Sequence, residues 1–145
     1  MGGILLVISA AVIIVVTALL FNDIDNTLDA AHKVILSKIK VNDLGKVETS
    51  LKSRDINSDV DMQVWGLDGE LQTSFGMLED FADRPFDVGA LRLNQTIYRD
   101  VQENDAHIRV LTIPLQQRGH VIAILHVAAS LDVVDAARKN LTDVL

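Results

Sequence analysis

The chain has 145 residues, enough for one domain, and its 13 basic and 20 acidic side chains give a formal net charge of −7. Such an acidic surface excludes nucleic acid as a partner, because phosphate recognition needs a basic surface, and it disfavours docking on anionic lipid headgroups. Because the sequence contains no cysteine, disulfides, thiolate metal sites and cysteine catalysis are excluded as well.

Residues 1–22 predict a transmembrane helix. The run from Ile4 to Phe21, ILLVISAAVIIVVTALLF, carries no charged side chain, and a run of this length covers roughly 30 Å of hydrocarbon. A cleaved signal peptide is the alternative, but it needs a basic start and an A-x-A-like cleavage site. Neither MGG before the run nor NDIDNTLD after it supplies these features, so an uncleaved anchor is expected.

A helix is expected to continue through residues 23–40. Its apolar residues are spaced four, three and four apart, which places them on one stripe: Ile24, Leu28, Ala31 and Ile35. The stripe could pack on the helix's own domain or form a seam with a second copy, and both can hold for one helix. Residues 41–59 are expected to be a loop with up to two helical turns, in which Leu44, Val47 and Leu51 would be the apolar side.

Five strands are predicted between residues 60 and 128. The segment DMQVWGLDGELQTSF places two β-prone runs around Asp68-Gly69, which favours a two-residue hairpin turn. Residues 96–101, 107–114 and 120–128 predict three more strands with short turns, so the sheet should be antiparallel. The last strand is apolar on both faces and is expected at the centre. Between the second and third strands, residues 76–94 form a long excursion, which is expected to be mobile and to border a ligand pocket.

Residues 130–145 predict a closing helix that carries a signal and contacts a second copy. Ser130 is a suitable N-cap, and Asp132 suits the first turn. A seam with three-four-three spacing follows, made of Val134, Ala137, Leu141 and Val144. With the first helix, this helix is expected to cover one face of the sheet. The fold class is therefore α+β.

Candidate ligand-binding residues are aromatic and basic. The proposed pocket walls are Trp65, Phe75, Phe81 and Tyr98. Arg99 and Arg109 could grip a small acid through paired hydrogen bonds, although cross-strand pairing with Asp100 or Glu103 is the simpler interpretation.

Metal binding and catalysis are not expected. His107 and His126 are only weak metal candidates, because zinc sites generally use three or four ligands. We therefore expect no metal site and no cofactor. Since the sequence has no nucleophile-and-base pattern and no phosphate loop, the chain itself is not expected to be an enzyme.

Three segments carry a family resemblance: NTLDAAHKVI after the span, VWGLDGELQTSF, and IRVLTIPLQQRGHVIAILHVAASLDVVDAARKNL. With them the chain resembles the N-terminal input region of bacterial two-component sensor histidine kinases, in which a span leads to a PAS-like extracytoplasmic sensor domain and a second span. The resemblance implies an anchor over 1–22 and a sensor domain over 23–145, with a helix at 23–40, a sheet core at 60–128 and an exit helix at 130–145.

The resemblance also implies a location and partners. Residues 23–145 would lie outside the cytoplasm, anchored in the bacterial inner membrane, although the span has no Lys or Arg on its N-terminal side to fix this orientation. The domain would form a homodimer, detect an unknown small molecule or ion, and reach a response regulator only through a kinase part that these residues lack. The alternative is a self-contained membrane-anchored binding or assembly protein.

Overall fold

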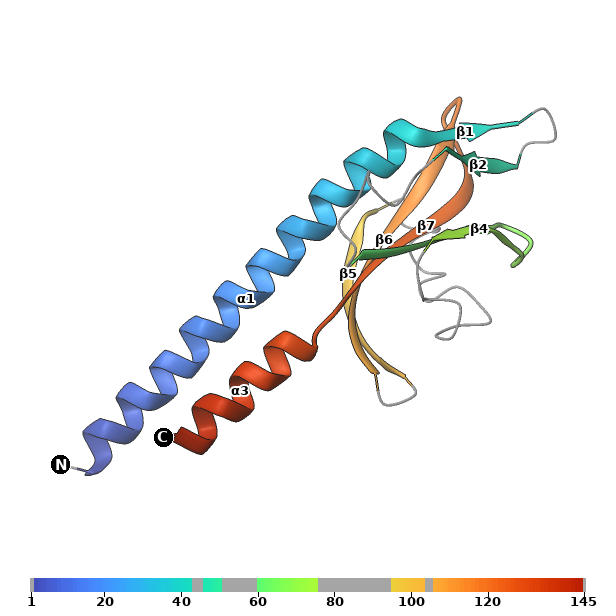
Figure 1. Ribbon diagram of the computed structural model, residues 1–145. Coiled ribbons are helices and arrows are strands. Elements are labelled where there is room, and N and C mark those ends of the chain that lie inside the picture. The colour runs from blue at the N-terminus through green and yellow to red at the C-terminus, as the bar shows by residue number, and fades with distance from the viewer. Residues whose placement is uncertain (1, 43–45, 51–59, 76–94, 104–105, 145) are drawn as a thin grey trace.

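The computed structural model describes residues 2–42, 46–50, 60–75, 95–103 and 106–144. A long helix, α1 (Gly2–Lys38), is followed by a small two-stranded sheet, β1 (Ile39–Val41) and β2 (Val47–Thr49). The main sheet contains β3 (Val60–Gly66), β4 (Leu71–Phe75), β5 (Ile97–Glu103), β6 (Ala106–Gln117) and β7 (His120–Ser130), and α3 (Asp132–Val144) closes the described chain (Figure 1).

The main sheet is antiparallel throughout, with the strand order β4-β3-β7-β6-β5. The prediction of an α+β fold with a five-stranded antiparallel sheet is therefore confirmed. The last strand, β7, lies at the centre, as its apolar character on both faces predicted. Its residues 123–129 are buried.

The helix α1 runs without interruption from the predicted span into the domain (Figure 1). No glycine or proline occurs between Ile4 and Lys38 to break it. Its N-terminal half is exposed, with Leu6 at 71%. Among the described residues it is the one helix long and apolar enough to cross a membrane.

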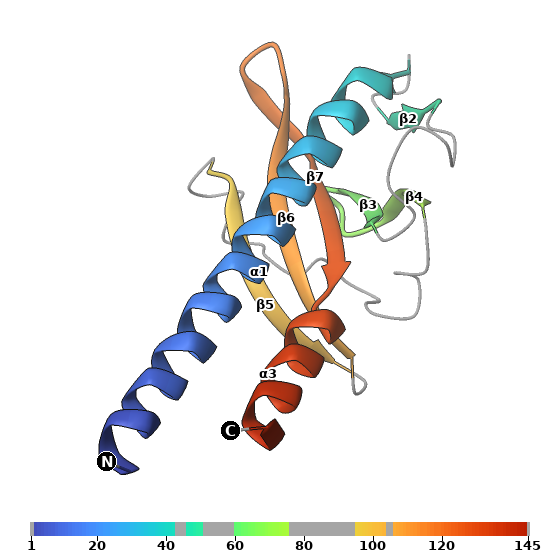
Figure 2. The ribbon, with the colours of Figure 1, turned by 60° about the vertical axis from the view of Figure 1, so that its left-hand side comes forward.

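The C-terminal half of α1 packs across the face of the sheet that β6 and β7 form (Figure 2). Leu28, Ala31 and Ile35 are 0%, 7% and 0% exposed, and they share a core with apolar side chains from β3, β6 and β7. Ile24 packs against the same core and is partly buried. The stripe thus packs on its own domain, and the three buried side chains are not available for a seam with a second copy.

The helix ends at Lys38, two residues earlier than expected, and the residues described directly after it, 39–42 and 46–50, are not helical. Val47 lies in β2, where it is 3% exposed and joins the core, so the expectation of helical turns is wrong at this residue. The small sheet is tied to the main one, because the Gln72 side chain accepts a hydrogen bond from the Val47 N–H at 2.9 Å. Leu44 and Leu51 lie outside the described residues.

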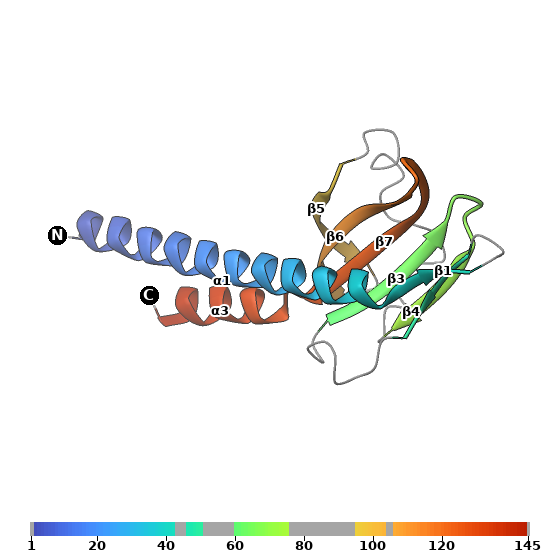
Figure 3. The same cartoon turned by 90° about the horizontal axis from the view of Figure 1, so that it is seen from above.

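The helix α3 does not cover the sheet, contrary to expectation. It leaves the end of β7 and runs back beside α1, beyond the sheet (Figures 1 and 3). Leu131 and Val134 are fully buried where the two helices and β6 meet. The predicted cap is present, since the Ser130 hydroxyl accepts a hydrogen bond from the Asp132 N–H at 3.1 Å.

The β3–β4 hairpin differs from the prediction in its turn. The Gly69 N–H donates to the Gly66 carbonyl at 3.1 Å, and the Gly66 N–H donates to the Glu70 backbone carbonyl at 2.8 Å. The β3–β4 loop between Gly66 and Glu70 therefore has three residues instead of two. Only Gly69, at φ 82°, has the left-handed conformation, whereas the expected two-residue turn needs it at both central positions. Arg118 and Gly119, at φ 54° and 81°, meet that requirement between β6 and β7.

A fully buried polar row crosses the sheet on the face opposite α1. Gln63 and Thr112 are both register partners of His126, and all three side chains are 0% exposed. Thr112 Oγ1 lies 3.0 Å from His126 Nδ1, and Trp65 Nε1 donates to Gln63 Oε1 at 3.0 Å. Burial lowers the pKa of His126 from 6.5 to about 4, so the folded protein holds a neutral imidazole there.

This burial predicts acid sensitivity. A histidine with a lower pKa in the folded state stabilises the fold fully above pH 6.5, and that contribution is lost as the pH falls toward 4, because the unfolded chain takes up the proton first. The unfolding free energy of the full chain in detergent micelles should fall by roughly 3 kcal/mol over this window. Replacing His126→Gln should flatten the profile, while His120→Gln, at an exposed position, should not. If the unfolding free energy falls equally with pH in the original protein and in both variants, His126 is not the cause of the acid sensitivity.

Candidate functional site

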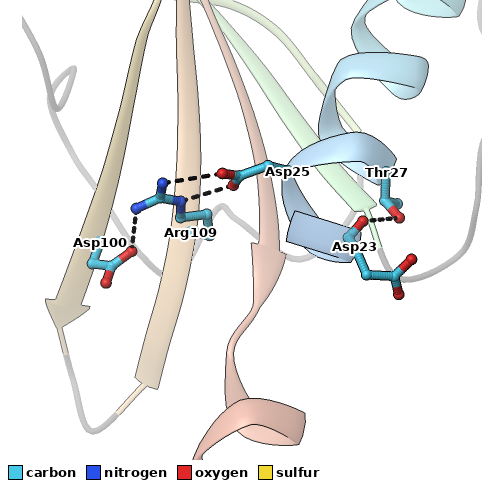
Figure 4. Close-up of polar contacts among 5 residues, drawn as sticks. All are labelled: Asp23, Asp25, Thr27, Asp100 and Arg109. Carbon is cyan, nitrogen blue, oxygen red and sulfur yellow. Dashed lines mark hydrogen bonds and ion pairs between the residues drawn. The ribbon is translucent and has the colours of Figure 1, made fainter. Parts of the chain in front are cut away.

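A cluster that we call the junction connects α1 to the edge of the main sheet. It consists of Phe21 and Asp25 of α1, Tyr98 and Asp100 of β5, and Arg109 of β6. Arg109 Nε donates to Asp25 Oδ1 at 2.9 Å and Nη2 donates to Oδ2 at 3.2 Å, while Nη1 donates to Asp100 Oδ1 at 2.7 Å (Figure 4). One guanidinium thus holds two carboxylates from different elements.

Aromatic rings complete the junction. The Arg109 guanidinium carbon lies 5.5 Å from the centre of the Phe21 ring and 5.6 Å from that of Tyr98, within the range of cation–π attraction. Arg138 of α3 lies 5.9 Å from the same Phe21 ring. The last residue of the apolar run therefore contacts both the sheet and α3.

Two residues of the junction, Arg109 and Tyr98, have raised pKa values. The hydrogen bond with Asp25 is the largest cause that raises the pKa of Arg109 above its ordinary value, and burial opposes it only in part. The pKa of Tyr98 is also raised, first by burial and then by the charges of Asp29 and Asp25. Arg109 is accordingly a permanent cation, and Tyr98 a neutral phenol at physiological pH.

A second polar contact ties the start of β6 to α3. His107 Nδ1 lies 2.9 Å from Asp135 Oδ2 and 3.2 Å from Oδ1, and the His107 carbonyl accepts a hydrogen bond from the Leu131 N–H at 2.8 Å. The first turn of α3 is therefore attached to the sheet by a side chain and by the backbone.

The predicted ligand-binding residues that the structure describes do not come together in one pocket. Trp65 is buried on the face opposite α1, while Tyr98 is in the junction and Phe75 packs against the core on the α1 side. Arg99 precedes the junction residue Asp100 and points to the other face of β5. Phe81 and the whole excursion, residues 76–94, lie outside the described residues.

Arg109 is not open to a small acid, because Asp25 and Asp100 occupy its guanidinium. Asp100 is its register partner, so the simpler interpretation, cross-strand pairing, describes this arginine. Asp25 and Phe21 were not among the candidates. Asp25 and Arg109 are 84 positions apart, and no local pattern pairs residues at that distance.

The two weak metal candidates are also separated. His126 pairs with Thr112 in register, and His107, five positions before Thr112, lies on the opposite face of the sheet. Each ring contacts a different partner, Thr112 or Asp135. Among the described residues, no group of three or more histidine and acidic side chains could hold a metal ion.

The family model described as "Two-component sensor kinase N-terminal" matches residues 3–141. The chain belongs to this family. It is the N-terminal sensor domain of a two-component sensor kinase, and the catalytic kinase domain is not in this chain.

Comparison with solved structures finds the PAS domain of BvgS from Bordetella pertussis, at 15% sequence identity and a TM-score of 0.35. The match covers 59% of the present chain and 85% of that chain. A search among curated proteins found no match.

The junction predicts a measurable coupling between Arg109 and Asp25. In a double-mutant cycle on the full chain in micelles, with Arg109→Met and Asp25→Asn, the coupling free energy should be about 1–2 kcal/mol, because the pair is bidentate and only 20% and 29% exposed. The Lys33–Asp29 pair, 70% and 44% exposed, is the matched control and should couple by less than about 0.5 kcal/mol. Equal coupling in the two pairs would show that the junction adds no more than a surface contact.

Proposed function

We propose that this sensor domain is the membrane-anchored, extracytoplasmic input region of its kinase, and that a stimulus acts by moving α1 and α3 relative to each other. The observation that carries this proposal is the continuity of α1, in which one unbroken helix contains both the apolar run and the stripe buried in the sheet core. A displacement of the sheet would reach the membrane directly, because no flexible linker can absorb it.

The junction supports this route. Asp25, held by Arg109, lies one helical turn beyond Phe21, at the boundary between the apolar run and the domain. Anchoring also accounts for the exposed N-terminal half of α1, whose apolar side chains would face lipid. Cleavage of a signal peptide after the apolar run would remove Phe21 from its contacts with two arginines.

Further features follow from the family and belong to the same proposal. The domain would work as a homodimer in the bacterial inner membrane, with residues 23–145 outside the cytoplasm. It would respond to a small molecule or ion, and a response regulator would be reached only through the kinase part.

The proposed seam on α3 is narrower than the sequence suggested. Val134 is fully buried within one chain, whereas Ala137 and Leu141 are half-buried and Val133 is 65% exposed. The side chain of Val144 lies outside the described part of the helix. A contact between copies would therefore use the side of α3 that carries Val133, Ala137 and Leu141.

Cysteine scanning tests this function. Single cysteines from residue 131 to 144 in the full-length kinase, in native membranes, should crosslink between copies with a period of three to four residues. Leu131 and Val134, which are buried within one chain, serve as internal controls and should not crosslink. Arg109→Met should shift the pattern, because it releases α1 from the sheet, and Lys33→Met should leave it unchanged. If the crosslinking yield does not vary with cysteine position in the original protein or in either variant, α3 does not form the proposed contact between copies.

A further inference from the structure

A cavity of about 350 Å³ opens where α1, the end of β7 and the start of α3 meet. Its volume falls in the range of small-molecule sites. The lining comes from three elements and consists of Leu20, Asp23, Ile24, Thr27, Ala129, Ser130 and Val133. None of these residues belongs to the junction, so the cavity is a separate feature of the same end of the domain.

The lining is mostly apolar and carries one charged group, the carboxylate of Asp23. No lysine or arginine lines the cavity. Within the described ranges, no side chain forms an ion pair or a hydrogen bond with this carboxylate. In Figure 4, Asp23 and Thr27 lie on a different side of α1 from Asp25, away from Arg109. The lining therefore complements a positive charge joined to an apolar group.

The hydroxyl groups of the lining favour the same ligand. Thr27 Oγ1 donates its only proton to the Asp23 carbonyl at 2.9 Å, which leaves it only acceptor lone pairs. The Ser130 oxygen accepts one hydrogen bond from the Asp132 N–H and keeps a second lone pair. With the carboxylate, these oxygens suit a ligand that donates several hydrogen bonds, as an ammonium group does.

The position of the cavity suits an amphipathic molecule. Leu20 belongs to the end of the apolar run, and Thr27 lies about 10 Å farther along the helix axis. If the apolar run spans the bilayer, the cavity crosses the boundary between lipid and water. An apolar tail would then lie beside Leu20 and a charged head beside Asp23.

We propose that this cavity binds a small amphipathic amine that enters from the aqueous side, with its ammonium group on Asp23 and its hydrocarbon part against Leu20, Ile24 and Val133. Its signalling consequence rests on the proposed function, because an occupant would separate α1 from the first turn of α3. The ammonium of a phosphatidylethanolamine headgroup offers the same chemistry, so the test must distinguish the two sources.

The test uses the full chain in phosphatidylcholine nanodiscs and n-octylammonium as the probe, titrated by calorimetry against empty discs. Binding should weaken at least tenfold in Asp23→Asn, which removes the charge, and in Val133→Trp, which fills the cavity from an exposed position. Asp132→Asn is the matched control, because it removes one negative charge from a residue that does not line the cavity. This variant should bind n-octylammonium with the same affinity as the original protein. The affinity for uncharged 1-octanol should be the same with and without the Asp23→Asn substitution.

The proposal is overturned if n-octylammonium binds the original protein and all three variants with equal affinity. It is also overturned if protein-containing and empty discs bind this probe equally. Discs that contain phosphatidylethanolamine provide the second arm. Loss of n-octylammonium binding in these discs would show that the lipid headgroup occupies the cavity. That result would overturn the proposal of a ligand that enters from the aqueous side. Circular dichroism of each variant checks the fold. The crosslinking pattern on α3 is measured without any ligand, so failure of this site and failure of the proposed function give different results.

Discussion

The packing of Leu28, Ala31 and Ile35 against the main sheet is the contact on which the rest of the structure depends. These side chains make the second half of α1 part of the domain core, while the first half remains exposed and apolar. Because one helix serves both purposes, the position of the sheet is fixed relative to the predicted span. A break in the helix between Phe21 and Leu28 would uncouple the sheet from the predicted span.

Apolar packing supplies most of the stability of this arrangement, and the Arg109 ion pairs supply its orientation. Full burial of one aliphatic side chain contributes about 1.5–3 kcal/mol, whereas the partly buried Arg109–Asp25 pair is expected to contribute about 1–2 kcal/mol, so the stripe as a whole supplies most of the stability. Apolar contacts have little directional preference. The bidentate pair with Asp25 fixes the rotation of α1 about its axis, which the stripe alone would leave less well defined.

The two terminal helices are both attached to β6, at different positions along the strand. His107 attaches α3 at the start of this strand, and Arg109, two residues farther along, attaches α1. A movement of β6 would therefore act on both helices at once. The cavity lies between the helices on the β7 side, so an occupant there would act on their separation without touching either polar attachment. If both proposals hold, sensing through the sheet and sensing through the cavity would be two separable inputs to one pair of helices.

The sequence by itself determined the elements whose signals are local. The uncharged apolar run predicted a long N-terminal helix. Hydrophobic patterning predicted the stripe on α1, the five antiparallel strands and the central position of β7, and Ser130 marked the start of α3, because each of these depends on residues within a few positions of one another. Tertiary structure alone decided that Asp25 meets Arg109, that His107 and His126 lie on opposite faces, and that α3 packs on α1 instead of on the sheet. These outcomes depend on strand register and on the order of strands in the sheet, which bring together residues such as Asp25 and Arg109, 84 positions apart, and no local pattern encodes that pairing.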